Sequence, residues 1–421
     1  MKRHLIGIGG VGMSALATAL LRLGDEVTGA DRTLGTPNVK FLESLGIRVF
    51  PDDGSGIDAA TDEVIVSTAI EETNAGLRKA KELGIPVTHR AKALARTLAG
   101  YRLVAVVGTC GKSTVTAMLG HVLSECGLDP MCVNGANVPG WEGAVRFGKG
   151  QYAVAEVDES DKSLVAFKPY AAIVTNASAD HYSKEEMDEV FDAFVKDLPG
   201  PLIDGRKEVE TLRCCEVEML RKVQPLPGAH NLQNATMAVA MAKALGVDVE
   251  RAIAAMKTFC GVERRLQLVS QPLNISTSQP APAVYDDYAH NPEKLHAMWT
   301  TLAEKYPAGI CVIWRPHGYA PLRKMMDALA AMFAETVRPQ DKLLLLPVYD
   351  AGGTTDRSVN SDELLRRLKA IEQSNNRTIQ VSDLDAAYAW CAAHKGEFGA
   401  FVTCGARDPG LPVLAKRLSE M

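Results

Sequence analysis

Short runs of apolar residues, rich in Val, Ile and Ala, alternate along the whole chain with longer stretches in which apolar residues recur at helical spacing. This alternation predicts an α/β fold, in which parallel sheets carry helices on both faces. The apolar runs fall into three blocks. They predict strands at 4–8, 26–30, 48–50, 63–67 and 86–89 in the first block, at 103–107, 152–157 and 171–175 in the second, and at 283–285, 310–314, 342–346 and 400–403 in the third.

Two polar segments separate the blocks, at residues 96–101 and 268–280, and the second is rich in Ser, Gln and Pro. A length of 421 residues suits two or three domains better than one. We therefore expect three α/β domains, with limits at 1–98, 99–268 and 269–421.

The composition favours a cytoplasmic protein. A formal net charge of −5 gives no electrostatic reason to expect a nucleic acid or an anionic membrane as a partner. The opening MKRHLIGIGGVGMSALATALL resembles a signal peptide, but glycines interrupt its apolar stretch and no cleavage site follows. Nine scattered cysteines without a C-x-x-C pair suit a reducing compartment. No uninterrupted apolar segment reaches membrane-spanning length.

The first candidate site is the glycine pattern GIGGVG at residues 7–12, which follows a predicted strand and opens a helix. Its glycines allow a diphosphate to approach the backbone N–H groups of the helix N-terminus, and Asp31 ends the next strand, where dinucleotide folds place a ribose-binding acid. The predicted ligand-binding residues are Gly9, Gly10, Val11, Gly12, Met13, Ser14 and Asp31. Alone, the pattern favours a nicotinamide-dependent oxidoreductase, and a tight turn without a ligand is the alternative.

The second candidate site is the loop GTCGKS at residues 108–113, which has two residues fewer between its glycines than the common phosphate loop. It follows an apolar strand and precedes a helix, as a phosphate loop requires. Its N–H groups can still surround an anion, Lys112 can reach the β- and γ-phosphates, and Ser113 can ligate Mg²⁺. The predicted ATP-binding residues here are Gly108, Thr109, Gly111, Lys112, Ser113 and Thr114.

Six motifs occur in the order found in the Mur ligases, and they are GTCGKST, AEVDESD, VTNASADH, PGAHNLQNA, GVERR and YDDYAHNP. The chain therefore resembles this family of ATP-dependent amide-forming enzymes of peptidoglycan synthesis, and its opening GIGGVGMSALA is most similar to the branch that acts on UDP-N-acetylmuramate and L-alanine. The resemblance implies a Rossmann-like N-terminal domain that binds the UDP-sugar, a central P-loop ATPase-like domain and a Rossmann-like C-terminal domain. It also implies ATP and Mg²⁺, or Mn²⁺, as cofactors, in a monomer or homodimer.

The resemblance extends to individual residues. It assigns catalysis to Lys112, Glu159, His181 and Arg265, metal binding to Ser113, Glu159 and His181, and further ATP contacts to Asn231, Asn234, Arg265 and Asp287. Glu156 is the alternative metal ligand, and helix capping is an alternative role for one of the two asparagines. Arg264, next to Arg265, is expected to be a surface charge.

The chain departs from the family pattern at three places. Cys110 stands where the alanine-adding branch has His, and the segment between Leu198 and Pro227 is shorter than usual in the family. In RPHGYAPLR, Gly318 and Pro321 stand where that branch has arginines that bind the amino acid's carboxylate. The residues left to bind the amino acid are His290, Arg315 and Arg323.

The third departure leaves the amine substrate open. L-alanine bound by Arg315 or Arg323 is the first interpretation, and a different amine such as a preformed peptide is the second. An NAD-dependent oxidoreductase would leave the loop at Lys112 unexplained. A non-catalytic nucleotide-binding paralogue is a further alternative, although Lys112, His181 and Asp287 are intact.

Overall fold

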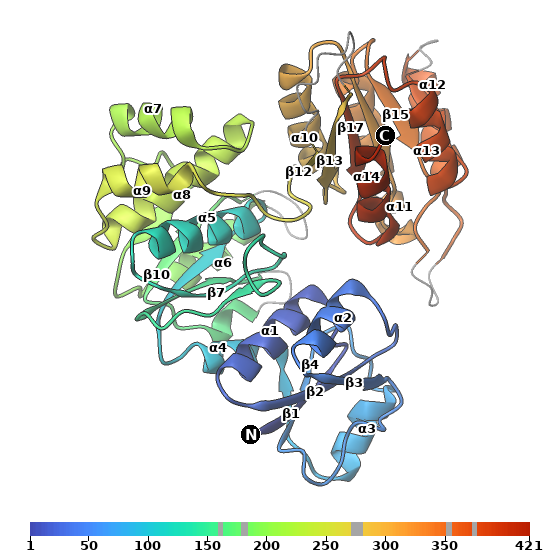
Figure 1. Cartoon of the computed structure of the whole chain (residues 1–421). Coiled ribbons are helices and arrows are strands. Elements are labelled where there is room, and N and C mark those ends of the chain that lie inside the picture. Colours follow the sequence, from blue (N-terminus) through green and yellow to red (C-terminus); the bar gives the residue numbers. More distant parts are fainter. Residues whose placement is uncertain (159–162, 178–183, 271–280, 351–355, 373–376) are drawn as a thin grey trace. The chain divides into compact units, whose positions relative to one another are not determined.

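The computed structural model describes residues 1–158, 163–177, 184–270, 281–350, 356–372 and 377–421. It confirms the α/β fold, with three sheets dominated by parallel strand pairs (Figure 1). Contacts between residues divide the chain into two compact units. The first contains Met1–Pro225 and Asn231–Val262, and the second contains Leu226–His230 and Glu263–Met421. Among the described residues, no helix is both long and apolar enough to cross a membrane.

The first sheet is fully parallel and has the strand order β3-β2-β1-β4-β5. Its strands are β1 (Lys2–Ile6), β2 (Glu26–Asp31), β3 (Arg48–Pro51), β4 (Glu63–Val66) and β5 (Val87–His89), and its helices are α1 (Val11–Arg22), α2 (Pro37–Ser44), α3 (Ala75–Glu82) and α4 (Arg90–Thr97). The central strand β1 is buried from Arg3 onward, so both of its faces are covered.

The second sheet has the order β11-β10-β6-β9-β7-β8, and only the edge strand β8 is antiparallel to its neighbour. Its strands are β6 (Arg102–Val107), β7 (Met131–Val133), β8 (Val145–Arg146), β9 (Tyr152–Glu156), β10 (Ala171–Val174) and β11 (Leu202–Asp204). The accompanying helices are α5 (Lys112–Glu125), the 3₁₀ turn η1 (Ser163–Ala166), α6 (Lys184–Val195), α7 (Cys214–Val223), α8 (Ala229–Ala244) and α9 (Val249–Met256).

The third sheet has the order β12-β13-β17-β14-β15-β16, and only β12 is antiparallel. Its strands are β12 (Gln267–Ser270), β13 (Ala283–Asp287), β14 (Ile310–Trp314), β15 (Lys342–Leu345), β16 (Thr378–Gln380) and β17 (Ala400–Cys404). Its helices are α10 (Pro292–Lys305), α11 (Tyr319–Thr336), α12 (Ser361–Glu372), α13 (Leu384–Ala393) and α14 (Gly410–Ser419). Helices α10, α11 and α12 share one hydrophobic core with the sheet, and α13 and α14 share another.

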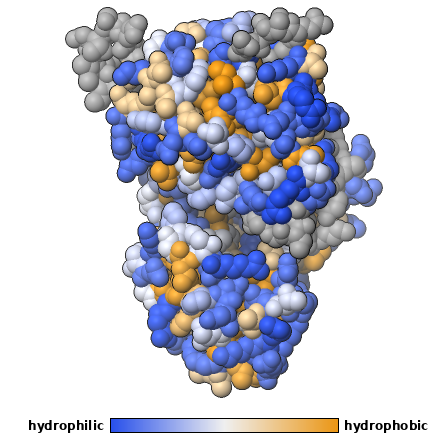
Figure 2. Space-filling model, turned by 90° about the vertical axis from the view of Figure 1, so that its right-hand side faces the viewer, coloured by the Kyte–Doolittle hydropathy of each residue, from blue (hydrophilic) through white to orange (hydrophobic). Residues whose placement is uncertain are grey.

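The predicted strands all occur, with ends displaced by two residues or fewer, but the short strands β7, β8, β11, β12 and β16 were not predicted. One prediction was wrong. Residues 268–270, assigned to a linker, belong to β12, which pairs with β13. This strand is brief and none of its residues is fully buried, so its composition resembles that of a linker. On the face shown in Figure 2, hydrophilic side chains predominate on the surface.

Candidate active site

The phosphate loop turns sharply between β6 and α5, and its two glycines allow that turn. Gly108 and Gly111 have φ angles of 128° and 84°, which residues with a Cβ rarely adopt. A Cβ on Gly108 would lie 2.1 Å from Thr175 Oγ1, and one on Gly111 would lie 2.7 Å from Asn234 Oδ1. Both the backbone and the neighbouring side chains therefore require glycine in this short loop.

Two residues that follow β10 hold the loop in shape. The Asn176 Oδ1 accepts hydrogen bonds from Thr109 Oγ1 (2.7 Å) and from the Cys110 N–H (2.9 Å). Asn176 Nδ2 and Thr175 Oγ1 both donate to the Cys110 carbonyl, at 3.0 and 2.6 Å. The loop is thus fixed at Cys110 through that residue's backbone.

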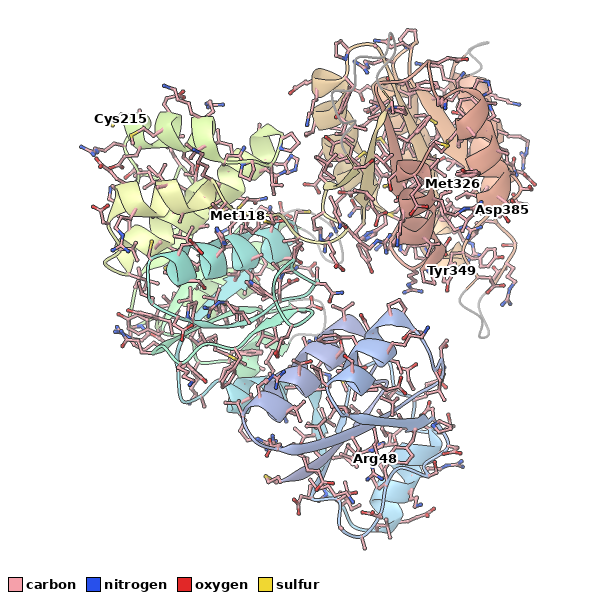
Figure 3. All side chains as sticks on the ribbon, viewed as in Figure 1. Arg48, Met118, Cys215, Met326, Tyr349 and Asp385 are labelled. Carbon is pink, nitrogen blue, oxygen red and sulfur yellow. The ribbon has the colours of Figure 1, made fainter. Side chains whose placement is uncertain are left out.

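Lys112, Ser113 and Thr114 form the first turn of α5, the helix on which Figure 3 labels Met118. Lys112 Nζ donates to the Gly108 carbonyl at 2.6 Å, so its ammonium group lies against the loop. The helix has no acidic residue in this turn and no side-chain cap. Its N-terminal N–H groups therefore favour an anion, as a triphosphate requires.

Asn231 and Asn234 lie close to the same loop. Both are buried in α8, and Asn234 Nδ2 donates to Asn231 Oδ1 at 3.3 Å. Since Asn234 Oδ1 faces Gly111, the structure brings the predicted nucleotide residues of α8 and of the loop together.

The predicted metal ligands are only partly within the described residues, because Glu159 and His181 lie outside them. Glu156, the alternative ligand, ends β9, and its Oε2 accepts a hydrogen bond from the Gly135 N–H at 2.8 Å. In the described part of the chain, no group of three or more His, Cys, Asp or Glu side chains could hold a metal ion. Ser113 at the phosphate loop still suits Mg²⁺, which binds largely through phosphates and waters.

The N-terminal glycine loop is ordered by its own neighbours. The Gly9 N–H donates to Asp31 Oδ2 at 2.8 Å, and Asn38 Nδ2 donates to the Gly9 carbonyl at 2.8 Å. Among the predicted UDP-sugar residues, Met13 is buried in the core and Ser14 Oγ donates to the Val11 carbonyl at 2.9 Å. The side chains of Met13 and Ser14 therefore make contacts within this domain. The exposed backbone of the first turn of α1 is the part that can contact a ligand.

Asp287, the predicted ribose ligand, ends β13 and is buried. Its two carboxylate oxygens accept hydrogen bonds from the N–H groups of Leu266 (2.6 Å) and Ala289 (2.7 Å). Burial raises the pKa of Asp287 to about 6. The residue thus ties the segment after Val262 to β13.

The prediction that Arg264 is a surface charge was wrong. Arg264 Nε pairs with buried Asp286 at 3.0 Å, and its guanidinium donates to the carbonyls of Gly405 and Ala406. The arginine is needed there because burial makes the Asp286 carboxylate costly without a cation. The neighbouring Arg265, predicted to contact ATP, lies 5.1 Å from the centre of the Tyr288 ring.

The two arginines predicted to bind the amino acid each have a carboxylate partner. Arg315 pairs with buried Asp408 at 2.5 Å, and Arg323 pairs with exposed Asp356 at 2.7 Å. The backbone N–H of Tyr349, labelled in Figure 3, donates to the Pro316 carbonyl at 2.8 Å and steadies the chain after β14.

His290, the third residue predicted to bind the amino acid, follows β13. Its Nδ1 lies 2.9 Å from the Tyr288 carbonyl, and its ring centre lies 4.7 Å from that of His317, which follows β14. The next residue, Asn291, caps α10 by accepting from the Lys294 N–H.

Two parts of this chain match known protein families. Residues 2–102 match the family described as "Mur ligase family, catalytic domain", and residues 264–407 match "Mur ligase, glutamate ligase domain". UDP-N-acetylmuramate–L-alanine ligase of Rhizobium etli is 30% identical over 468 aligned positions, which cover 99% of this chain and 97% of that protein. The enzyme of the same name from Rhizobium meliloti is also 30% identical, with the same coverage. The chain belongs to the Mur ligase family.

Solved structures of other Mur ligases share the fold. The UDP-N-acetylmuramate–alanine ligase of Thermotoga maritima gives a TM-score of 0.80 at 24% identity and covers 100% of this chain and 98% of its own. A murein peptide ligase from Psychrobacter arcticus gives 0.66 at 20% identity, covering 100% and 99%. The three-domain architecture predicted for this Mur ligase is therefore confirmed.

This Mur ligase lacks segments that its relatives carry, since the alignment of 468 positions exceeds its 421 residues. The structure fills the short segment between Leu198 and Pro227 with β11 and α7. The second sheet and the phosphate loop are complete beside it.

Arg90 is a candidate site residue that sequence reasoning missed. It begins α4, and a Cβ placed on Gly12 would lie 2.9 Å from an Arg90 Nη atom, so its guanidinium covers the first turn of α1. Among the described residues it forms no hydrogen bond or ion pair. Arg90 is thus a cation available beside the predicted diphosphate site, and its distance in sequence from the glycine pattern concealed it.

Asn134 is a second residue that the sequence did not single out. It follows β7, next to the strand that ends in Glu156, and it is 3% exposed. Neither the oxygen nor the nitrogen of its side-chain amide has a hydrogen-bond partner among the described residues. Buried amides are normally satisfied, so Asn134 has unused hydrogen-bonding capacity at the edge where the phosphate loop also lies.

Proposed function

We propose that this Mur ligase uses ATP to join L-alanine to the carboxylate of UDP-N-acetylmuramate, in peptidoglycan synthesis. Its curated relatives are named UDP-N-acetylmuramate–L-alanine ligase, and their similarity to this chain extends over nearly the whole length of both proteins. The observation that supports the activity most directly is the phosphate loop. Lys112 Nζ lies against Gly108 of this loop, and Asn234 Oδ1 faces Gly111. A carboxylate is a poor electrophile, and phosphorylation by ATP gives it a leaving group as an acyl phosphate.

The proposed ATP site is centred on the phosphate loop. Lys112 would neutralise charge on the transferred phosphoryl group, and the N–H groups of the loop would hold the β-phosphate. Asn231 and Asn234 would contact the nucleotide from α8, and Arg265 and Asp287 are the further predicted ATP contacts. Mg²⁺ or Mn²⁺, when bound, would supply further positive charge, held by Ser113 with Glu159 and His181.

The proposed UDP-sugar site lies at the first turn of α1. Gly9, Gly10, Val11 and Gly12 would present backbone N–H groups to the diphosphate, and Asp31 would face the ribose. Arg90 adds a guanidinium that can bind phosphate oxygens in a bidentate manner.

The domain at 269–421 is proposed to bind the amine, and the domains at 1–98 and 99–268 would hold the sugar and ATP. We place the reaction in the cytoplasm, where ATP is available and where nine cysteines without disulfides suit the redox state. A preformed peptide is the second candidate amine, because Gly318 and Pro321 cannot bind a carboxylate through their side chains.

A phosphate-release assay tests the activity. The purified chain would be incubated with UDP-N-acetylmuramate, ATP and Mg²⁺ against a panel of amino acids and short peptides. We expect release that depends on the UDP-sugar and is fastest with L-alanine, with the amide product seen by mass spectrometry. If phosphate were released fastest with a peptide, that peptide would replace L-alanine as the proposed amine. If no amine gave phosphate release, the ligase assignment would be overturned.

A further inference from the structure

The strand order places a topological switch point at the carboxyl-terminal edge of the third sheet, beside β17. This strand lies between β13 and β14, and all three are parallel. The helices that follow its two neighbours, α10 and α11, share one core with the sheet, whereas α14, which follows β17, belongs to the core of the opposite face. Loops that leave adjacent strands toward opposite faces create the crevice in which open α/β sheets bind ligands.

The loop after β17 is held firmly at this crevice. The Gly405 N–H donates to the Asp287 carbonyl at 3.2 Å, and the Arg315 N–H donates to the Cys404 carbonyl at 3.0 Å. Asp408, further along the loop, is buried and binds the Gly410 N–H at 2.8 Å in addition to Arg315. Arg407 therefore projects from a backbone anchored on both sides.

Arg407 differs from the other arginines around it, because it has no partner among the residues that the structure describes. Arg264, Arg315 and Arg323 are each paired with an aspartate. Arg407 is exposed, and in the part of the chain that the structure describes it forms no hydrogen bond or ion pair. Its charge is therefore available to a ligand at the crevice.

The chain segments on either side of β17 make the crevice suitable for an amino acid. His290 and His317, from the loops after β13 and β14, place their ring centres 4.7 Å apart. Gly318 then precedes α11 as its N-cap residue and, as a glycine, provides no side-chain cap. The uncapped first turn of an 18-residue helix adds a favourable field for a carboxylate.

We propose that Arg407 binds the α-carboxylate of the amine substrate and so supplies the recognition that Gly318 and Pro321 cannot. The assignment rests on the proposed ligase function. A guanidinium binds a carboxylate through two parallel hydrogen bonds, which fixes both the position and the orientation of a small amino acid.

Kinetics with two amines test the assignment. The KM values for L-alanine, L-alaninamide and ATP would be measured for the wild type, Arg407→Gln and Arg407→Lys in the phosphate-release assay. We expect Arg407→Gln to raise the KM for L-alanine at least tenfold, while kcat/KM for L-alaninamide, which has no carboxylate, changes less than twofold. The KM for ATP should stay within twofold of the wild-type value, and Arg407→Lys should recover part of the loss because it keeps the charge.

Two further variants sharpen the result. Arg417→Gln removes an exposed arginine from the last turn of α14 and should leave all three KM values unchanged. Arg323→Gln tests the other arginine predicted to bind the carboxylate, and it should leave the KM for L-alanine unchanged if Arg407 has this role. An unchanged L-alanine KM in Arg407→Gln, or an equal loss with L-alaninamide, would overturn the assignment while the ligase activity stands. A wild type without activity on any amine would overturn both.

Discussion

Lys112 Nζ donates to the Gly108 carbonyl, whereas Arg315 and Arg323 pair with the carboxylates of Asp408 and Asp356. At the scale of single residues, these carboxylates tie the two arginines to the fold, and the contact with Gly108 holds the Lys112 ammonium group against the phosphate loop.

The first prediction concerns Lys112. Lys112→Ala should lower the rate of product formation more than tenfold, because the developing charge on the phosphoryl group loses its fixed cation. Binding of UDP-N-acetylmuramate, measured by calorimetry, should be nearly unchanged, since the proposed sugar site is on the first sheet. Turnover at a tenth of the wild-type rate or better would rule out this role.

The second prediction concerns His4, which is fully buried in β1 with Nδ1 2.9 Å from Thr28 Oγ1. Burial lowers its pKa from 6.5 to about 4. As pH falls, the His4 imidazole therefore takes up a proton in the unfolded chain at a higher pH than in the folded chain. The stability that a neutral His4 contributes is present above pH 6.5 and is lost between pH 6.5 and 4. The loss from His4 between pH 7 and 5 should be about 2 kcal/mol.

Urea denaturation of the wild type and His4→Gln at several pH values measures this loss. The free energy of unfolding of the variant should fall less steeply over the same interval, whatever its value at pH 7. Parallel curves for the two proteins would show that His4 does not titrate as expected.

At the scale of elements, both glycine loops join a strand to a helix with no side-chain cap, and in both a second element completes the site. Asn176, after β10, completes the phosphate loop, and Arg90, at the start of α4, completes the N-terminal loop. Each partner lies far from its loop in sequence.

The third prediction concerns Arg90. Arg90→Gln should raise the KM for UDP-N-acetylmuramate about tenfold or more, the cost of one charge-assisted contact, and leave the KM for ATP unchanged. Arg32→Gln provides a matched control, because Arg32 is 72% exposed and pairs with Asp52. An effect of equal size in both variants would mean that Arg90 acts only through general surface charge.

The sequence predicted most strands of the three sheets and both glycine loops, because local pattern determines them. A run such as RLVAVV specifies a buried strand, and glycines at fixed spacing specify a turn with positive φ. It could not predict that Arg264 binds Asp286 and two carbonyls of the loop after β17, because that contact depends on strand order. The same reason explains why Arg90 and Asn134 were not recognised.

At the scale of the whole molecule, the proposed nucleotide residues are divided between the two compact units. Lys112, Asn231 and Asn234 belong to the first, and Arg265 and Asp287 belong to the second.

The fourth prediction concerns the metal that the proposed ATP site needs. Activity should require Mg²⁺ or Mn²⁺, and His181→Ala should raise the metal concentration at half-maximal rate, because a ligand is lost. His121→Ala is a suitable comparison, since His121 bonds to Ala255 and Thr258 away from the loop. Full activity in excess chelator would exclude the phosphoryl-transfer scheme.

The hydrogen bonds from Asn176 and Thr175 to the phosphate loop have a thermodynamic consequence. A loop already held in its binding shape loses little conformational entropy when a nucleotide arrives. ATP binding to this chain should therefore carry a small entropic penalty. Removing the Asn176 side chain should increase this penalty more than it reduces the favourable enthalpy of ATP binding. The affinity for ATP would then depend on the two residues that follow β10, although these residues need not touch the nucleotide themselves.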